Sequence, residues 1–328
     1  MNGARALCWA MTTGEAGMVS QANGLAQALG LPFAVKTVHP GIPWRWLPGH
    51  WAARLGGPAN LRPEDDISPP WPDILITCGR RSVAVALAIK RASGGRTFTV
   101  HIQDPRVPAG YFDMVVPPEH DGLVGENVFP TRGALHRLTR EGLSQASEHF
   151  RDRFSSVRRP FVAVLIGGKS KAYDLTASRM QQLATQLLEL AARHGAGLVV
   201  TTSRRTGTEN EAILQRVLAD TDAQIWDGAG ENPYFGMLGS ADYIVVTEDS
   251  ASMVSEACFT GKPVYVAKME GGSKRFEAMH RQFLESGYTR MFEGNLEHWD
   301  SQPLDETRRI AAIVRERVAS HDSKGSNR

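Results

Sequence analysis

Residues 161–170, Phe-Val-Ala-Val-Leu-Ile-Gly-Gly-Lys-Ser, decide the fold of this chain. The six apolar residues are typical of a strand, and the two glycines that follow predict a loop. From Thr176 to His194 the apolar residues then recur at the spacing of an amphipathic helix. Strand, glycine loop and helix in this order form half of a βαβ unit, which predicts a mostly parallel sheet covered by helices.

The same order occurs twice along the chain. The first half opens with a strand at 6–11, a loop at 12–17, a helix that ends at Gly30 and a second strand. Further strand and helix patterns alternate to residue 116 in the first half and to residue 318 in the second. We therefore expect an α/β protein of the GT-B type, with two Rossmann-like domains whose parallel sheets face each other across a cleft.

Residues 151–160 are polar and basic, and this composition places the domain boundary there. The expected domains are 1–155 and 156–320. The polar residues 321–328 are expected to form a disordered tail.

Composition excludes several classes of protein. The formal net charge is only +2, which does not favour a nucleic-acid partner. No apolar run approaches the roughly 20 residues that cross a bilayer, and the N-terminus lacks a secretory pattern, so we expect a cytoplasmic protein. The three cysteines, Cys8, Cys78 and Cys258, lie in apolar patterns without zinc-ligand spacing, so no metal site is expected.

In parallel sheets, ligands bind beyond the carboxyl ends of the strands, so the loops after the strands form the candidate site. After the strand at 243–247, small hydroxyl residues begin a helix whose free N–H groups can hold a phosphate. Glu256 lies about one turn beyond Ser252, where its carboxylate can accept hydrogen bonds from ribose hydroxyls. The alternative is a plain helix cap and a surface acid. A phosphate site beside a ribose site suits a nucleoside-diphosphate sugar, the donor of a sugar transfer. The candidate donor-binding residues of this segment are Glu248, Asp249, Ser250, Ser252 and Glu256.

Residues 167–170 resemble the end of a P-loop, but Ala163 stands where that motif requires its first glycine. A P-loop triphosphatase is therefore disfavoured. Gly167 and Gly168 still allow close approach of the backbone to a phosphate, which Lys169 can neutralise. The alternative is a tight turn with a solvated lysine.

Two further segments of the second half are candidates for the donor site. Ser203, Arg204 and Arg205 end another strand, where the arginines can hold a diphosphate or form a solvated basic turn. Asn232 and Tyr234 suit contacts to a nucleotide base, or ordinary packing at the start of a helix.

The first half supplies the expected acceptor side. Glu15 is a candidate general base for an acceptor hydroxyl, or an acid favoured by the helix dipole, and Asp104 is the second candidate. The absence of G-x-G-x-x-G gives no support to a nicotinamide dehydrogenase. The remaining acceptor-side candidates are Gly14, Gly17, Arg80, Arg81 and Gln103.

Residues 43–55 contain Trp44, Trp46 and Trp51 among basic residues. This composition suits a membrane interface or a lipid-linked acceptor, and the alternative is packing of a long connection. The hypothesis predicts peripheral contact with the inner face of the membrane.

Several of these segments together carry a family resemblance. From about Leu7 to Glu293 the chain resembles the plant mitochondrial-fission (elongated-mitochondria) protein family and its bacterial relatives, which are described as glycosyltransferases. The segments that carry it are 13–17, 101–105, 166–169, 203–206 and 246–250, with Ser252 and Glu256.

A more distant similarity is to the GT-B transferase that adds N-acetylglucosamine in peptidoglycan synthesis. That resemblance implies a ribose-binding role for Glu256, because Val254-Ser255-Glu256 matches the Val-Ser-Glu of that enzyme. Met18 stands in the place of its first-loop histidine, which leaves Glu15 or Asp104 as the base.

These patterns predict transfer of a sugar from a nucleoside-diphosphate sugar to a lipid or polysaccharide acceptor of the cell envelope. Helix N-termini and basic side chains can stabilise the departing diphosphate, so no metal or other cofactor is expected. One alternative is a nucleotide-sugar epimerase or hydrolase of the same shape. Another is a non-catalytic adaptor, because the resemblance to the plant proteins, which are adaptors for a fission GTPase, does not imply catalysis.

Overall fold

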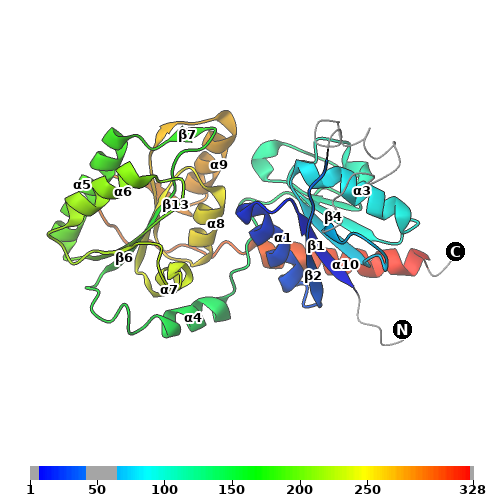
Figure 1. Ribbon diagram of the computed structural model, residues 1–328, viewed down its shortest axis with the longest axis horizontal. Helices are drawn as coiled ribbons and strands as arrows, with labels where there is room; N and C mark the ends of the chain where they lie inside the picture. Colours follow the sequence, from blue (N-terminus) through cyan, green and yellow to red (C-terminus); the bar gives the residue numbers. More distant parts are fainter. Residues whose placement is uncertain (1–6, 42–64, 326–328) are drawn as a thin grey trace. The chain divides into compact units, whose positions relative to one another are not determined.

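The computed structural model describes residues 7–41 and 65–325, and the chain divides into two compact units (Figure 1). The first unit contains the chain up to Arg137 and again from Asp305, and the second is Leu138–Leu304. The tryptophan-rich stretch 43–55 lies outside the described residues, so its predicted membrane role stays a prediction.

A parallel sheet forms the centre of the first unit, with the strand order β2-β1-β3-β4-β5. Its register sets Cys8 opposite both Phe33 and Ile74. Because all strands run the same way, their carboxyl ends meet at one edge. The strands are β1 Cys8–Thr12, β2 Phe33–Thr37, β3 Ile74–Cys78, β4 Phe98–Ile102 and β5 Met114–Val116.

Helices cover both faces of this sheet. Alternate residues of β1 point to opposite faces: Ala10 packs with α1 (Ala16–Ala28), and Met11 packs with α3 (Val83–Ala92). Three short 3-10 turns follow β3, β4 and β5, at Arg80–Ser82, Ala109–Tyr111 and Glu119–Asp121.

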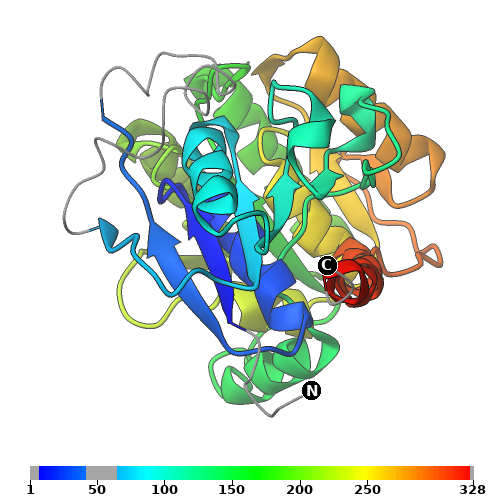
Figure 2. The ribbon, with the colours of Figure 1, turned by 90° about the vertical axis from the view of Figure 1, so that its right-hand side faces the viewer.

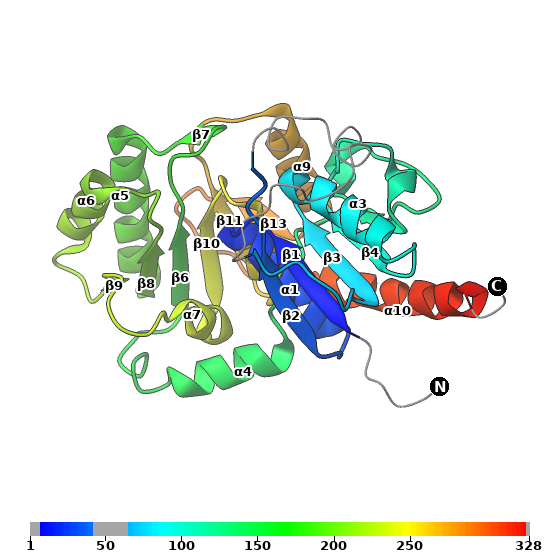
Figure 3. The same ribbon diagram turned by 45° about the vertical axis from the view of Figure 1, so that its right-hand side comes forward.

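The last helix, α10 (Glu306–Gly325), belongs to the first unit and lies beside α1 (Figure 2, Figure 3). Ile310 and Val314 are buried in the core of that unit, and Arg315 donates to the carbonyl of Ala28 at the end of α1 (2.8 Å). The expected second domain, 156–320, therefore does not keep its last helix. The expected disordered tail is also wrong in part, because α10 extends through residue 325.

The second unit is built on a larger parallel sheet, with the order β13-β11-β10-β6-β8-β9. A short antiparallel pair, β7 (Tyr173–Asp174) with β12 (Glu270–Gly271), lies outside it. The strands of the large sheet are β6 Phe161–Ile166, β8 Gly197–Thr202, β9 Gln224–Trp226, β10 Tyr243–Thr247, β11 Val264–Ala267 and β13 Thr289–Met291.

Strand β6 is buried on both faces, as its continuous apolar sequence predicts. Val162, Val164 and Ile166 pack with the helices on one face, and the alternate residues pack with those on the other. The helices of the first face are α5 Ala177–His194 and α6 Thr208–Leu218. Those of the second are α4 Arg140–His149, α7 Tyr234–Ser240, α8 Ala251–Phe259 and α9 Lys274–Glu285.

The boundary between the units falls at Arg137/Leu138 and not at 155/156. Leu143 and Phe150 of the α4 region are buried in the core of the second unit, against α7. A Cβ on Gly236 would overlap the ring of Phe150, so this glycine allows the two segments to pack closely. Composition alone does not assign α4 to the second unit, because this helix exposes nearly all of its polar residues.

Candidate functional site

Three loops of the second unit meet at the carboxyl edge of its sheet. They follow β10, β6 and β8, which are neighbours in that order. The structure thus brings together the glycine pair, the Ser-Arg-Arg turn and the Glu-Asp-Ser segment that the sequence singled out.

The two glycines serve this convergence. The amide of Gly167 donates to Thr247 Oγ1 (2.8 Å), and that of Gly168 donates to Asp249 Oδ2 (3.1 Å). A Cβ on Gly167 would overlap the Asp249 carboxylate, and one on Gly168 would overlap the carbonyl of Arg205. Both amides thus already bond to the neighbouring loop, and the expected approach of a phosphate to Gly167 and Gly168 stays a prediction.

Asp249 is the centre of the loop network. Its side chain is 0% exposed, and its two oxygens accept from Thr247 Oγ1 (2.7 Å) and from Arg205 Nη2 (2.7 Å). Arg205 also donates to the carbonyl of Gly168 (3.3 Å). A buried carboxylate requires such compensation, so Arg205 stabilises the site itself.

Arg204 differs from Arg205 although it is adjacent in sequence. Its side chain is exposed and has no ion-pair partner among the residues that the structure describes. Ser203 fixes the turn, since its hydroxyl accepts from the amide of Arg205 (3.2 Å) and its amide donates to Thr206 Oγ1 (3.0 Å). Of the two arginines, Arg204 is therefore the one available to an anionic ligand.

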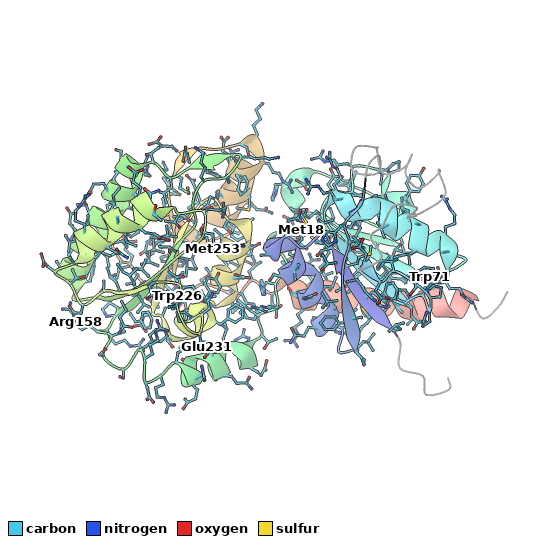
Figure 4. All side chains as sticks on the ribbon, viewed as in Figure 1. Met18, Trp71, Arg158, Trp226, Glu231 and Met253 are labelled. Atoms are coloured by element: carbon cyan, nitrogen blue, oxygen red, sulfur yellow. The ribbon has the colours of Figure 1, made fainter. Side chains whose placement is uncertain are left out.

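Helix α8 begins at the same edge and extends past Met253 (Figure 4). Ser250 is its N-cap, with an extended backbone (φ −126°, ψ 99°) and a hydroxyl that accepts from the amide of Met253 (3.3 Å). Ser252 lies in the first turn and is partly exposed. The capping interpretation of Ser250 is confirmed, while contact with a phosphate stays a prediction.

Glu256 is a buried acid and not a surface one. Its side chain lies on α8, the residue is 8% exposed, and its Oε2 accepts from the phenol of Tyr234 (2.6 Å), the first residue of α7. Asn232 fixes the start of α7 by accepting from the amide of Tyr234 (2.9 Å). Burial and the adjacent carboxylate raise the pKa of Tyr234 well above its usual value, so the phenol stays a donor.

Glu248 and Lys169 make local contacts at the rim of the site. Glu248 Oε1 accepts from the amide of Met269 (2.5 Å), its carbonyl accepts from His280 (2.8 Å), and burial raises the pKa of its carboxyl. Lys169 donates to Asp174 of β7 (2.8 Å), which raises the pKa of the lysine. Glu248 thus joins the loops after β10 and β11, and Lys169 forms an exposed ion pair with Asp174.

The acceptor-side candidates meet at the carboxyl edge of the first sheet. Glu15 Oε2 accepts from Thr13 Oγ1 (2.5 Å), and its Oε1 accepts from Arg81 (3.4 Å). Arg80, Gly14 and Gly17 are exposed beside it. Gly79 has a left-handed backbone (φ +87°), and a Cβ there would overlap the sulfur of Met18. Met18 lies on α1 (Figure 4).

Asp104 lies in the loop after β4, and both of its carboxylate oxygens contact Arg106. Its Oδ1 accepts from the amide of Arg106 (2.8 Å), and its Oδ2 pairs with the Arg106 guanidinium (3.1 Å). Gln103 has a left-handed backbone (φ +80°) at the turn. Both carboxylates that the sequence offered as a base are thus bonded to an arginine.

Sequence reasoning missed a histidine–carboxylate pair in the first unit. His39, just after β2, lies 2.7 Å (Nδ1 to Oδ1) from Asp65, a buried residue. The residues are 26 positions apart, and neither stands in a local motif that the sequence could reveal.

Among residues 7–41 and 65–325, no group of three or more His, Cys, Asp or Glu side chains is placed to hold a metal ion. None of the helices described is long and apolar enough to span a membrane.

Known structures define the class of this fold. The UDP-GlcNAc 2-epimerase of Methanocaldococcus jannaschii matches 94% of this chain and 99% of its own, with a TM-score of 0.56 and 13% identity. The 2-epimerase of Neisseria meningitidis bound to UDP-GlcNAc matches 96% and 99%, with a TM-score of 0.51 and 13% identity. The chain is thus an α/β protein of the GT-B class.

The family model described as mitochondrial fission ELM1 matches residues 16–318, and the chain belongs to this family. The mitochondrial fission protein ELM1 of Arabidopsis thaliana is 32% identical over 276 residues, which are 76% of this chain and 64% of the plant protein. This chain therefore matches less than two thirds of the plant protein. An uncharacterized protein of Rickettsia prowazekii, RP120, is 26% identical over 284 residues, 74% of this chain and 79% of its own length.

Proposed function

We propose that the protein is a glycosyltransferase that moves a sugar from a nucleoside-diphosphate sugar to an acceptor of the cell envelope. The observation that carries the proposal is the buried carboxylate of Glu256, which accepts a hydrogen bond from Tyr234. Glu256 lies on α8, the helix that begins at the carboxyl edge of the sheet. Ligands of parallel α/β sheets bind at this edge, and a fixed carboxylate there suits a ribose diol.

The diphosphate would lie at the start of α8, near Ser250 and Ser252, with Arg204 as the main counter-charge. The helix N-terminus favours an anion, and Arg204 has no other ion-pair partner among the described residues. Because these groups can stabilise the departing diphosphate, the proposal includes no metal or other cofactor. A structure of similar fold was solved with UDP-GlcNAc and UDP, with a TM-score of 0.55 and 14% identity, which supports UDP-sugars as the first probes.

Glu256→Gln tests the donor site. We expect titration calorimetry with UDP-GlcNAc, or with whichever nucleotide-sugar binds wild type, to show at least about tenfold weaker binding, since a charge-assisted hydrogen bond contributes about 1.5–3 kcal/mol. Glu231→Gln is the matched control, because Glu231 is an exposed acid of the same unit. Glu15→Gln, in the other unit, is expected to bind as wild type does. Unchanged binding by Glu256→Gln would show that the donor-site assignment is wrong.

The adaptor alternative also has an observation in its favour. The amides of Gly167 and Gly168 and the charge of Arg205 are all used within the protein, which leaves few groups for a diphosphate. If wild type binds no UDP-, GDP-, ADP-, CMP- or TDP-linked ligand, with or without magnesium, the adaptor role is favoured. A nucleotide-sugar that is converted without any acceptor would instead indicate an epimerase or hydrolase.

We place the reaction in the cytoplasm, with an acceptor at the inner face of the membrane. This part of the proposal depends on the tryptophans of residues 43–55. A lipid-linked acceptor would explain aromatic and basic residues in one short segment.

A further inference from the structure

We propose that the second unit contains a further binding site, for a small organic phosphate, in a cavity between α4, α7 and the loop that follows α8. This site is separate from the donor site and does not depend on the proposed transferase function. All residues that line the cavity lie within Leu138–Leu304, so the site uses no residue of the first unit.

The cavity has a volume of about 400 Å³, which lies within the usual range of small-molecule sites, roughly 300–1,000 Å³. Helix α4 packs along α7 (Figure 1, Figure 3). A Cβ on Gly239 would overlap the carbonyl of Leu143, so this glycine allows the two helices to approach closely beside the cavity. The lining residues that carry the argument are the polar Arg140, Ser144, Ser147 and Lys262 and the apolar Leu238 and Phe259.

Lys262 is a partly buried cation that lacks a counter-ion. Its amine donates to the carbonyls of Leu238 (2.8 Å) and Gly239 (2.7 Å) in the last turn of α7, which leaves one of its three N–H groups unused. Among the described residues, no carboxylate forms an ion pair with this amine. Burial lowers the pKa of Lys262 to about 8, while Asp242 raises it and Arg159 lowers it by smaller amounts. An anion in the cavity would supply the missing counter-charge.

Arg140 supplies a second cation. It is the first residue of α4, it is exposed, and its side chain has no ion-pair partner in the part of the chain that the structure describes. Ser144 follows one turn later on the same face of α4, and the hydroxyl of Ser147 lies 2.9 Å from that of Ser240. A guanidinium with hydroxyl donors beside it suits the oxygens of a phosphate.

The charges around the cavity indicate the class of ligand. Glu148 is the acid among the lining residues, and it pairs with Arg151. Two positive charges, those of Lys262 and Arg140, therefore remain to be balanced. They match the double negative charge of a phosphate monoester near neutral pH. The apolar lining residues suit an organic body attached to that phosphate, which an inorganic ion does not have.

The cavity lies at the far ends of the helices that form the proposed donor site. Tyr234 and Ser250 stand at the starts of α7 and α8, whereas Gly239 and Thr260, at the ends of these helices, line the cavity. At about 1.5 Å per residue, the nine residues of α8 separate the two places by about 13 Å. A ligand in the cavity therefore does not occupy the place proposed for the nucleotide-sugar.

Titration calorimetry at pH 7, with phenyl phosphate as the probe, tests the site. We expect wild type to bind phenyl phosphate but not phenol, which lacks the phosphate. Arg140→Ala should bind the probe at least about tenfold more weakly, because a charge-assisted contact is lost. Arg153→Ala is the matched control, since Arg153 is an exposed arginine outside the cavity, and it should bind as wild type does.

The same titrations separate this cavity from the donor site. Arg204→Ala, which changes only the proposed donor site, should bind phenyl phosphate as wild type does. If wild type does not bind the probe, or if Arg140→Ala binds it as tightly as wild type, the inference is overturned. Weaker binding by Arg204→Ala alone would place the probe in the donor site and would also overturn it.

The pH dependence tests whether the ligand contacts Lys262. A bound phosphate favours the charged amine and so raises the pKa of Lys262, which means that affinity falls as the pH rises above about 8. Wild type should bind phenyl phosphate about tenfold more weakly at pH 9 than at pH 7, because only about a tenth of the free amines are charged one unit above their pKa. Lys262→Met should bind weakly without this fall. Equal affinity of wild type at both pH values would contradict the role of Lys262.

Chemical protection locates the bound probe in wild type. Acetic anhydride acylates neutral amines, and peptide mass spectrometry can compare Lys262 with the exposed Lys171 in the same sample. Saturating phenyl phosphate should slow the acylation of Lys262 at pH 8 and leave that of Lys171 unchanged. If Lys262 reacts at the same rate with and without the probe, the cavity does not hold the phosphate and the inference is refuted.

Discussion

Arg205→Ala is the substitution that most directly tests the loop network of the second unit. Among the residues that the structure describes, the guanidinium removed is the only charged partner of Asp249, and two neutral donors, Thr247 Oγ1 and the amide of Gly168, remain. Loss of one partner of a buried ion pair costs about 3–5 kcal/mol. Arg205 is 42% exposed, so water can reach the vacated place, and we expect a loss nearer about 2 kcal/mol.

Thermal unfolding followed by circular dichroism is the assay. A loss of about 2 kcal/mol lowers the melting temperature of a unit of this size by about 4–8 °C. Arg204→Ala is the matched control, since it removes an exposed, adjacent arginine without an ion-pair partner among the described residues. It should change the melting temperature by about 1 °C or less.

In melting temperature the larger effect is expected for Arg205→Ala, but in affinity for UDP it is expected for Arg204→Ala. Arg204→Ala should weaken binding of UDP by about tenfold, because the proposed counter-charge for the diphosphate is lost. If Arg205→Ala melts within about 1 °C of Arg204→Ala, the compensating role of Arg205 is refuted. A lower melting temperature for Arg204→Ala than for Arg205→Ala would reverse the assignment of the two arginines.

Two further predictions concern the first unit and the segment 43–55. Burial lowers the pKa of His101 from 6.5 to about 3. Between these pH values the unfolded chain binds a proton that the folded chain does not. The free energy of unfolding therefore falls as the pH drops from about 6.5 toward 3. His101→Gln should therefore reduce the loss of melting temperature between pH 7 and pH 5, and equal losses in both proteins would contradict this. Replacement of Trp44, Trp46 and Trp51 by alanine should abolish co-sedimentation with liposomes of anionic lipid, and equal sedimentation of both proteins would end the membrane hypothesis.

Much of the fold could be predicted because strands buried on both faces have a strong local signature. Residues 161–166 and 243–247 are continuous apolar runs, and the structure places both in the centre of the second sheet. Helix α4 has no such signature, since Leu143 is its only buried residue. A helix anchored by one side chain has the composition of a linker, which is why the boundary was expected too late in the chain.

Topology made the positions of the loops predictable, but the bonds within them were not. Parallel strand order brings the ends of β10, β6 and β8 together, whatever the side chains are. The bond from Gly168 to Asp249 joins residues 81 apart in the chain. A glycine pair that packs closely against a carboxylate cannot be told from its sequence apart from a glycine pair that lies close to a phosphate. The pair of His39 and Asp65 was missed for the same reason, because only the folded chain makes them neighbours.

The buried Asp249 also bears on the choice between enzyme and adaptor. A carboxylate inside a loop proposed to lie near a diphosphate repels that ligand unless its charge is cancelled locally, and Arg205 supplies this cancellation. The network is then neutral, so the attraction for a diphosphate depends on Arg204 and the N-terminus of α8. A transferase of this design should bind its donor about tenfold more weakly when Arg204 is replaced by alanine, whereas an adaptor has no need of an exposed arginine at the carboxyl edge of its sheet.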